Sequence, residues 1–219
     1  MSRSDICLSI GNIDLQVLTI QLDSVQLAEI RIDLFKQPIA QLIPIFKSHQ
    51  NLIITFRNEQ NNHEEKIISI YTTAIDNGVK YIDIDANLPE PIKKELIQRA
   101  HNKNTKIILS YHDFTQTPEY NKLNEIVLTL KTQQADIVKI ACMAKCYSDC
   151  ANMMSLYTKH TNIIAFCIGE IGKITRIVAP IVGAPFTYAG IPGSETAQGQ
   201  FSYGETERLL NQFKPLGNG

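Results

Sequence analysis

Lys139 lies inside an apolar run, residues 135–141 (ADIVKIA), which predicts a strand buried on both faces. Burial disfavours an ammonium group and lowers the pKa of a lysine, so the side chain becomes a nucleophilic amine. Such an amine forms Schiff bases with carbonyl compounds. The alternative is a strand-end lysine whose charged group reaches solvent, and this run taken alone favours that alternative.

Two further side chains fit proton transfer beside such an amine. His112 and Asp85 stand at the ends of two preceding apolar runs. A histidine near neutral pKa can move protons on and off a nitrogen adduct or a substrate carbon. A carboxylate such as Asp85 can orient the imidazole and support its charge. A lone strand-end histidine is more often a satisfied core residue, so the chemical interpretation depends on Lys139 beside it.

Charged side chains at other run ends predict a site for an anionic ligand. Glu29, Arg31 and Asp33 alternate along one run, so they share one face of a strand. Three such groups cannot be buried without partners, and we expect this face to line an interior pocket. Arg57 and Arg176 follow later runs, and their planar guanidinium groups suit a carboxylate. The alternatives are a structural Glu29–Arg31 ion pair and a surface helix position for Arg176.

Short apolar runs alternate with longer amphipathic segments, which predicts strands and helices in turn. Strands are expected at residues 6–10, 27–33, 52–56, 81–85, 106–111, 137–141, 163–167 and 181–184. Helices are expected at residues 13–22, 39–47, 64–77, 91–102, 118–132, 147–160, 172–178 and 203–213.

Eight strand–helix repeats favour a parallel sheet with right-handed crossovers, and eight strands close a (β/α)8 barrel, the TIM barrel. We expect one compact catalytic domain over residues 1–213, followed by a frayed tail at 214–219. An open doubly wound sheet is the alternative. No Gly-x-Gly-x-x-Gly follows the first predicted strand, which argues against a dinucleotide fold. In a barrel, the polar residues at the carboxyl ends of the strands meet at one rim.

Composition narrows the function classes. The 219 residues are 44% hydrophobic and 20% charged, with a net charge of -1. This charge and the absence of a basic stripe argue against nucleic acid as a partner. No apolar run reaches the roughly 18 residues of a membrane span, and no signal-peptide core follows Met1, so we expect a cytoplasmic protein.

The five cysteines predict free thiols, because their number is odd and the chain lacks a signal. Cys142, Cys146 and Cys150 are spaced four apart and would share one face of a helix. This spacing is not a zinc pattern, and no histidine lies near it before His160. Packing of small apolar side chains against the barrel is therefore favoured over a metal site.

Six short motifs follow one another along the chain at the spacing of strand–helix repeats. Together they make the chain resemble the type I 3-dehydroquinate dehydratases, the Schiff-base dehydratases of the shikimate pathway. The resemblance covers residues 6 to about 200. It rests on EIRID at 29–33, TFR at 55–57, SYHDF at 110–114, DIVKIA at 136–141, GAPFTYA at 183–189 and GQ at 199–200.

The resemblance implies a role for each matching residue. Lys139 would form the imine with the ketone of 3-dehydroquinate, and His112 would be the general acid/base. Asp85 stands where the family usually has a glutamate that positions this histidine, and its shorter side chain reaches less far. The remaining residues would bind the substrate: Glu29 and Arg31 its hydroxyl groups, Arg57 and Arg176 its polar groups and carboxylate, and Thr196 and Gln200 from the last loop.

The resemblance further implies a homodimer and no metal or organic cofactor. The last loop differs most from the family pattern, with TAQGQ at residues 196–200 in place of SAPGQ. Loss of the proline predicts a more mobile lid. The sequence leaves two other functions open. One is another lysine Schiff-base barrel such as a class I aldolase, and the other is a binding barrel without turnover.

Overall fold

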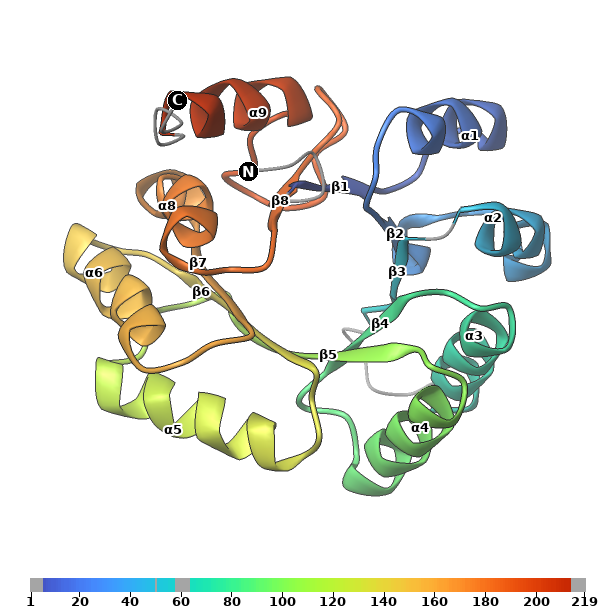
Figure 1. Cartoon of the computed structure of the whole chain (residues 1–219), viewed down its shortest axis with the longest axis horizontal. Helices are drawn as coiled ribbons and strands as arrows, with labels where there is room; N and C mark the ends of the chain where they lie inside the picture. Colours follow the sequence, from blue (N-terminus) through green and yellow to red (C-terminus); the bar gives the residue numbers. More distant parts are fainter. Residues whose placement is uncertain (1–5, 50, 58–63, 214–219) are drawn as a thin grey trace, which may run out of the picture.

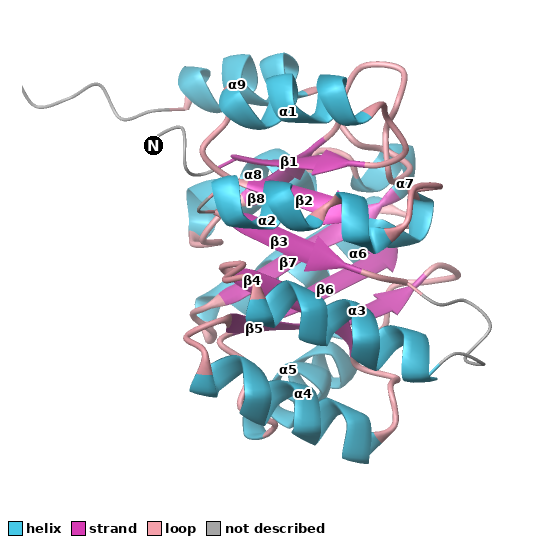
Figure 2. Ribbon diagram, turned by 90° about the vertical axis from the view of Figure 1, so that its right-hand side faces the viewer, coloured by secondary structure: helices cyan, strands magenta, loops and turns pink. Residues whose placement is uncertain are grey.

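Eight parallel strands surround the interior of the molecule, and helices cover their outer side (Figures 1 and 2). The computed structural model describes residues 6–49, 51–57 and 64–213. Strands β1 to β7 are neighbours in chain order, and β8 pairs with β1. No β7–β8 ladder is present among the described residues, so the TIM barrel is nearly closed.

Seven of the eight strands form where the sequence predicts them, within two residues at most of their ends. The strands are β1 (Ile6–Ile10), β2 (Ala28–Arg31), β3 (Leu52–Thr55), β4 (Tyr81–Asp85), β5 (Lys106–Asp113), β6 (Ile137–Met143), β7 (Ile163–Ile168) and β8 (Thr187–Ala189). The α-helices are α1 (Leu15–Asp23), α2 (Ile43–Ser48), α3 (Glu64–Asp76), α4 (Glu90–Asn102), α5 (Tyr120–Thr132), α6 (Tyr147–Ser155), α7 (Gly169–Gly172), α8 (Thr175–Val182) and α9 (Tyr203–Gln212). Short 3-10 helices are η2 (Ile32–Leu34), η3 (Ile39–Gln41) and η4 (Leu156–Thr158).

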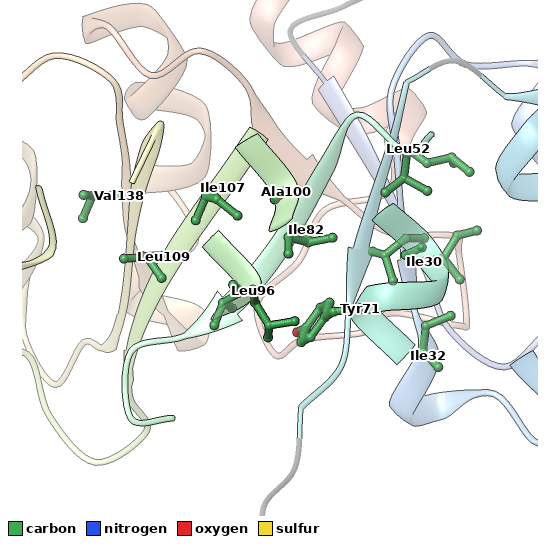
Figure 3. Close-up of a cluster of buried hydrophobic side chains, with 14 of the residues drawn as sticks. Ile30, Ile32, Leu52, Tyr71, Ile82, Leu96, Ala100, Ile107, Leu109 and Val138 are labelled. Carbon is green, nitrogen blue, oxygen red and sulfur yellow. The ribbon is translucent and has the colours of Figure 1, made fainter. Parts of the chain in front are cut away.

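The main hydrophobic core lies between the strands and the surrounding helices (Figure 3). Helix α3 shows why: its apolar side chains repeat at helical spacing and form one buried face, with Ile67, Ile70, Tyr71, Ala74 and Ile75. The Tyr71 hydroxyl also donates a hydrogen bond to the Asp83 backbone carbonyl oxygen at 2.5 Å. This contact ties α3 to β4 below the rim.

A second core fills the barrel interior in layers. Residues two apart on a strand face the same side, and alternate strands contribute to one layer. The apolar layer, at or just before β2, β4, β6 and β8, consists of Leu27, Tyr81, Ile137 and Phe186. Two residues further along the same strands lies the polar layer, which consists of Glu29, Asp83, Lys139 and Tyr188.

The predicted strand at 181–184 is wrong. These residues are the end of α8 and the turn after it, and β8 follows at Thr187–Ala189. The run is apolar because α8 packs against β7 and β8 on one side. Gly183 caps the helix with a φ of 130°, and Pro185 follows before the strand. The helix predicted at 172–178 is accordingly two helices, α7 and α8.

The three spaced cysteines do not share one helix. Cys142 is buried on β6, Cys146 is the exposed N-cap of α6, and Cys150 is buried on α6. In the described ranges, no three His, Cys, Asp or Glu side chains are grouped as metal ligands. The helices that the structure describes include none long and apolar enough to cross a membrane. The predicted tail at 214–219 lies outside the described residues.

Candidate active site

A cavity of about 510 Å³ opens at the carboxyl ends of the strands. Nine of the ten residues that the sequence assigned to a pocket line it: Glu29, Arg31, Arg57, Asp85, His112, Lys139, Arg176, Thr196 and Gln200. The expectation for Asp33 is wrong, because β2 ends at Arg31 and Asp33 lies in η2, outside the cavity lining. The sequence therefore predicted which charged side chains gather in this cavity, although not the contacts between them.

Lys139 is held in the polar layer and does not reach solvent. Lys139 is only 6% exposed, so the alternative of a lysine whose charged group reaches solvent is wrong. Its Nζ donates a hydrogen bond to Asp83 Oδ2 at 2.9 Å and lies 3.8 Å from Glu29 Oε1. The Tyr188 ring centroid lies 4.1 Å from the same atom, within cation–π distance. Two carboxylates and an aromatic face thus surround the amine.

Asp83 is the residue at this centre that sequence reasoning missed. It is fully buried, its Oδ1 lies 2.7 Å from Arg57 Nη2, and the Ser110 hydroxyl donates to it at 2.6 Å. Burial alone would raise the pKa of Asp83, but the positive charges of Arg57 and Lys139 outweigh it and hold that pKa well below its usual range. The carboxylate therefore stays ionised. Its sequence signal was its position two residues before Asp85, on the same face of β4.

Glu29 is satisfied within the barrel. Its carboxylate accepts hydrogen bonds from the hydroxyl groups of Ser9 and Thr55, the latter at 2.7 Å. Arg31 pairs with Asp33, through Nη2 to Oδ2 at 2.7 Å and Nε to Oδ1 at 3.1 Å. The alternative of a structural Glu29–Arg31 ion pair is therefore wrong.

His112 stands at the rim without the predicted carboxylate contact. Its Nδ1 lies 3.9 Å from Asp85 Oδ2, beyond hydrogen-bond distance, and is buried without a hydrogen-bond partner in the described structure. The Phe114 ring stacks on the imidazole, with centroids 5.7 Å apart. Burial, with the charges of Arg57 and Lys139, lowers the pKa of His112 well below 6.5. The imidazole is therefore neutral at pH 7 and available as a base.

Arg176 is a buried cation, and the surface-helix alternative for it is wrong. It stands on the first turn of α8 with 2% of its surface exposed, and burial lowers its pKa to about 10. Its guanidinium carbon lies 4.3 Å from the centroid of the Phe166 ring, and its Nε has no hydrogen-bond partner among the described residues. No carboxylate in the described ranges forms an ion pair with it. The arrangement can receive an anionic group.

The loop that carries Thr196 and Gln200 lies across the cavity. The Thr196 and Ser9 hydroxyl oxygens are 2.6 Å apart, and Arg31 Nη1 donates to the Thr196 carbonyl oxygen at 3.3 Å. Gln200 Oε1 accepts from the Thr196 backbone N–H at 3.0 Å. Gly199 has a φ of 72°, and a Cβ there would lie 2.6 Å from the Gly169 carbonyl oxygen. Only glycine fits this close approach.

A family profile described as Type I 3-dehydroquinase matches residues 6–216. The chain belongs to the type I 3-dehydroquinase family. A 3-dehydroquinate dehydratase of Thermococcus gammatolerans is 32% identical over 199 residues, 89% of this chain and 91% of that protein. The Methanocaldococcus jannaschii protein of the same name is 35% identical over 188 residues, 82% of this chain and 83% of its own.

Solved structures of type I 3-dehydroquinases share the fold. The enzyme from Clostridium difficile, solved with covalently modified comenic acid, has a TM-score of 0.84 at 22% identity. The alignment covers 97% of this chain and 93% of that one. A tryptophan synthase α-subunit from Pyrococcus furiosus aligns with a TM-score of only 0.60 at 12% identity. Membership of the 3-dehydroquinase family decides against the class I aldolase considered from the sequence.

Proposed function

We propose that this chain dehydrates 3-dehydroquinate to 3-dehydroshikimate through an imine on Lys139, as a hydro-lyase of the shikimate pathway. The observation that carries the proposal is the buried Lys139 amine in a cavity that also holds a neutral imidazole and the Arg176 guanidinium group, whose Nε has no hydrogen-bond partner among the described residues. An amine, a base and an anion-binding group are what a dehydration beside a ketone requires.

In the proposed reaction the Lys139 amine adds to the substrate ketone, and loss of one water gives a protonated imine. His112 removes the proton from the neighbouring carbon, and the electron pair moves to the nitrogen as an enamine forms. The enamine electrons then form the new C=C bond as the hydroxyl group one carbon further leaves, taking the proton from His112. Hydrolysis of the imine uses one water and restores the amine. The net change is loss of one water.

Arg176 is proposed to bind the substrate carboxylate, because it is buried and has no carboxylate partner of its own. Arg57 is already paired with Asp83, but its Nη1 has no hydrogen-bond partner among the described residues and can still bind a substrate oxygen. Glu29 and Arg31 are proposed to bind substrate hydroxyl groups.

The remaining proposed contacts come from the rim. Thr196 and Gln200 would close over the substrate, since their loop already contacts Ser9 and Arg31. Asp85 is proposed to support the charge on His112 across 3.9 Å and not through a direct hydrogen bond.

Borohydride reduction of the enzyme with 3-dehydroquinate tests the mechanism. We expect a stable mass gain on Lys139 and formation of the conjugated product in the unreduced sample, followed by its absorbance. The variant Lys139→Ala should show neither. A product formed without any adduct on Lys139 would refute the imine, and binding without turnover would support the binding-barrel alternative.

We also propose a homodimer that uses the outer face of α8. Ile174, the N-cap of α8, and Ile181 and Val182 in its last turn are 50%, 42% and 44% exposed. Such an apolar face on a helix is typical of a contact with another protein surface. Sedimentation of the wild type and of Ile181→Glu tests this, with a shift from dimer to monomer expected.

A cytoplasmic location is a further proposal. It rests on the biosynthetic enzyme family and on five cysteines that are all free thiols. Fractionation of cells that express the chain would test it.

A further inference from the structure

The carboxylate of Asp83 is placed against the nitrogen on which the proposed imine forms. Asp83 Oδ2 accepts the hydrogen bond from Lys139 Nζ at 2.9 Å, while its Oδ1 is held by Ser110 and Arg57. These contacts fix both oxygens of the carboxylate. Glu29 is farther from Nζ, at 3.8 Å, and its oxygens already accept from Ser9 and Thr55.

Imine formation changes what the nitrogen can donate. An ammonium has three N–H groups, whereas a protonated imine carries the same charge with a single N–H in the plane of the C=N bond. The ring of Tyr188 occupies one side of this nitrogen, at 4.1 Å. The remaining N–H is therefore expected to point at the nearest fixed acceptor, which is Asp83 Oδ2.

We propose that Asp83 is the counter-ion of the imine nitrogen: it remains a carboxylate through the reaction, accepts the single N–H and so fixes the plane of the imine. This inference rests on the proposed function. A fixed imine plane would align the neighbouring C–H bond with His112, and a fixed negative charge would keep the imine protonated and electron-withdrawing.

Asp83 fits this role better than that of a proton acceptor. Arg57 and Lys139 hold its pKa well below the usual range in spite of burial, so it does not take a proton from the amine at neutral pH. The charged and titratable groups around the nitrogen come from six strands: Cys7 on β1, Glu29 on β2, Arg57 just after β3, Asp83 on β4, His112 on β5 and Tyr188 on β8.

The variant Asp83→Asn keeps the shape of the side chain and removes its charge. We expect kcat to fall roughly 100-fold or more, by analogy with loss of one electrostatic stabiliser. The alkaline limb of kcat should move to lower pH by about one unit or more, because an imine without its counter-ion loses its proton more readily. A merely structural role would not move this limb. Asp76→Asn is the matched control, since Asp76 is exposed and pairs with Arg99 at the surface.

A measurement on the wild-type protein guards against a variant that fails to fold. In a crystal structure of the borohydride-reduced adduct, the nitrogen should lie within hydrogen-bond distance of Asp83 Oδ2. The counter-ion proposal would be overturned by a nitrogen that points to Glu29 in this structure, or by an Asp83→Asn variant whose alkaline limb stays at the wild-type pH. In either case the adduct on Lys139 would still support the proposed function. Absence of that adduct from the wild type would overturn both.

Discussion

The polar layer and the apolar layer of the barrel interior come from the same four strands, two residues apart. In the apolar layer, an Ile or Phe side chain removed from water stabilises the fold by about 1.5–3 kcal/mol. In the polar layer, each charge has a partner: Lys139 lies against Asp83 and Glu29, and Arg57 pairs with Asp83. The two layers follow each other along the same strands, so the side chains decide that one layer is apolar and the other holds the buried charges.

The difference shows how a parallel barrel can hold buried charges at its centre. The apolar layer lies below and keeps water out, which strengthens every electrostatic contact above it. In the polar layer and its contacts, two carboxylates face two cations, so the buried charges balance before any ligand binds. Arg176 stands outside this balance, because it has no carboxylate partner among the described residues.

The largest expected effect comes from removing the amine of the polar layer. Lys139→Met should lower kcat by roughly 10⁴-fold or more, because the reaction loses its imine. Turnover of 3-dehydroquinate, followed by product absorbance, measures this. The control is Lys94→Met, an exposed position on α4, which should keep wild-type turnover. Substantial turnover in Lys139→Met would remove the functional distinction between the layers.

The next largest effect on activity is expected from Arg176, the cation without a carboxylate partner. Arg176→Gln should lower kcat/KM by about 30- to 150-fold, mostly through KM, because a charge-assisted contact contributes about 2–3 kcal/mol. Steady-state kinetics measure the split, and Arg99→Gln at the surface is the control. An unchanged KM would show that the substrate carboxylate binds elsewhere.

A smaller effect is the pH dependence set by His112. Since burial and the charges of Arg57 and Lys139 lower the pKa of His112 in the folded protein, the acid limb of kcat/KM should lie below pH 6.5. The unfolded chain binds a proton near that pH while the folded chain does not, so stability should also fall as the pH drops below 6.5. A pH–rate profile and pH-dependent denaturation test both, and an acid limb above 6.5 would contradict the assignment.

The smallest effect on activity is expected in the apolar layer. Ile137 lies two residues before Lys139 on β6, and Ile137→Val should reduce the free energy of unfolding by about 1 kcal/mol. Denaturant unfolding measures that change, and kcat should remain at the wild-type value. A loss of kcat without a loss of stability would mean that packing in the apolar layer positions the polar layer above it.

The residues that the sequence placed at strand ends line one cavity for a physical reason. Parallel strands of a barrel end at one rim, so the polar residues near their carboxyl ends meet there, as Arg57 after β3, His112 near the end of β5 and Arg176 on α8 do. The same reasoning missed Asp83, because it considered only the rim. Lys139 is the third residue of β6 and lies below the rim, so its partner has to lie at the same level of the barrel interior. The prediction of a strand at 181–184 was wrong because the outer side of α8 is also apolar there, so the sequence lacks the alternation of polar and apolar residues that is typical of a surface helix.

The amino-acid sequence by itself determined seven of the eight strands, the family and nine of the residues that line the cavity, because these depend on local pattern and chain order. Only the tertiary structure decided which carboxylate meets the amine. Asp85, Ser110 and Lys139 are aligned in the strand register of β4, β5 and β6, yet Lys139 contacts Asp83. Strands in a barrel are tilted, so residues at the same level of the interior are offset along the hydrogen-bond register, here by two residues between β4 and β6. The local sequence does not contain that offset.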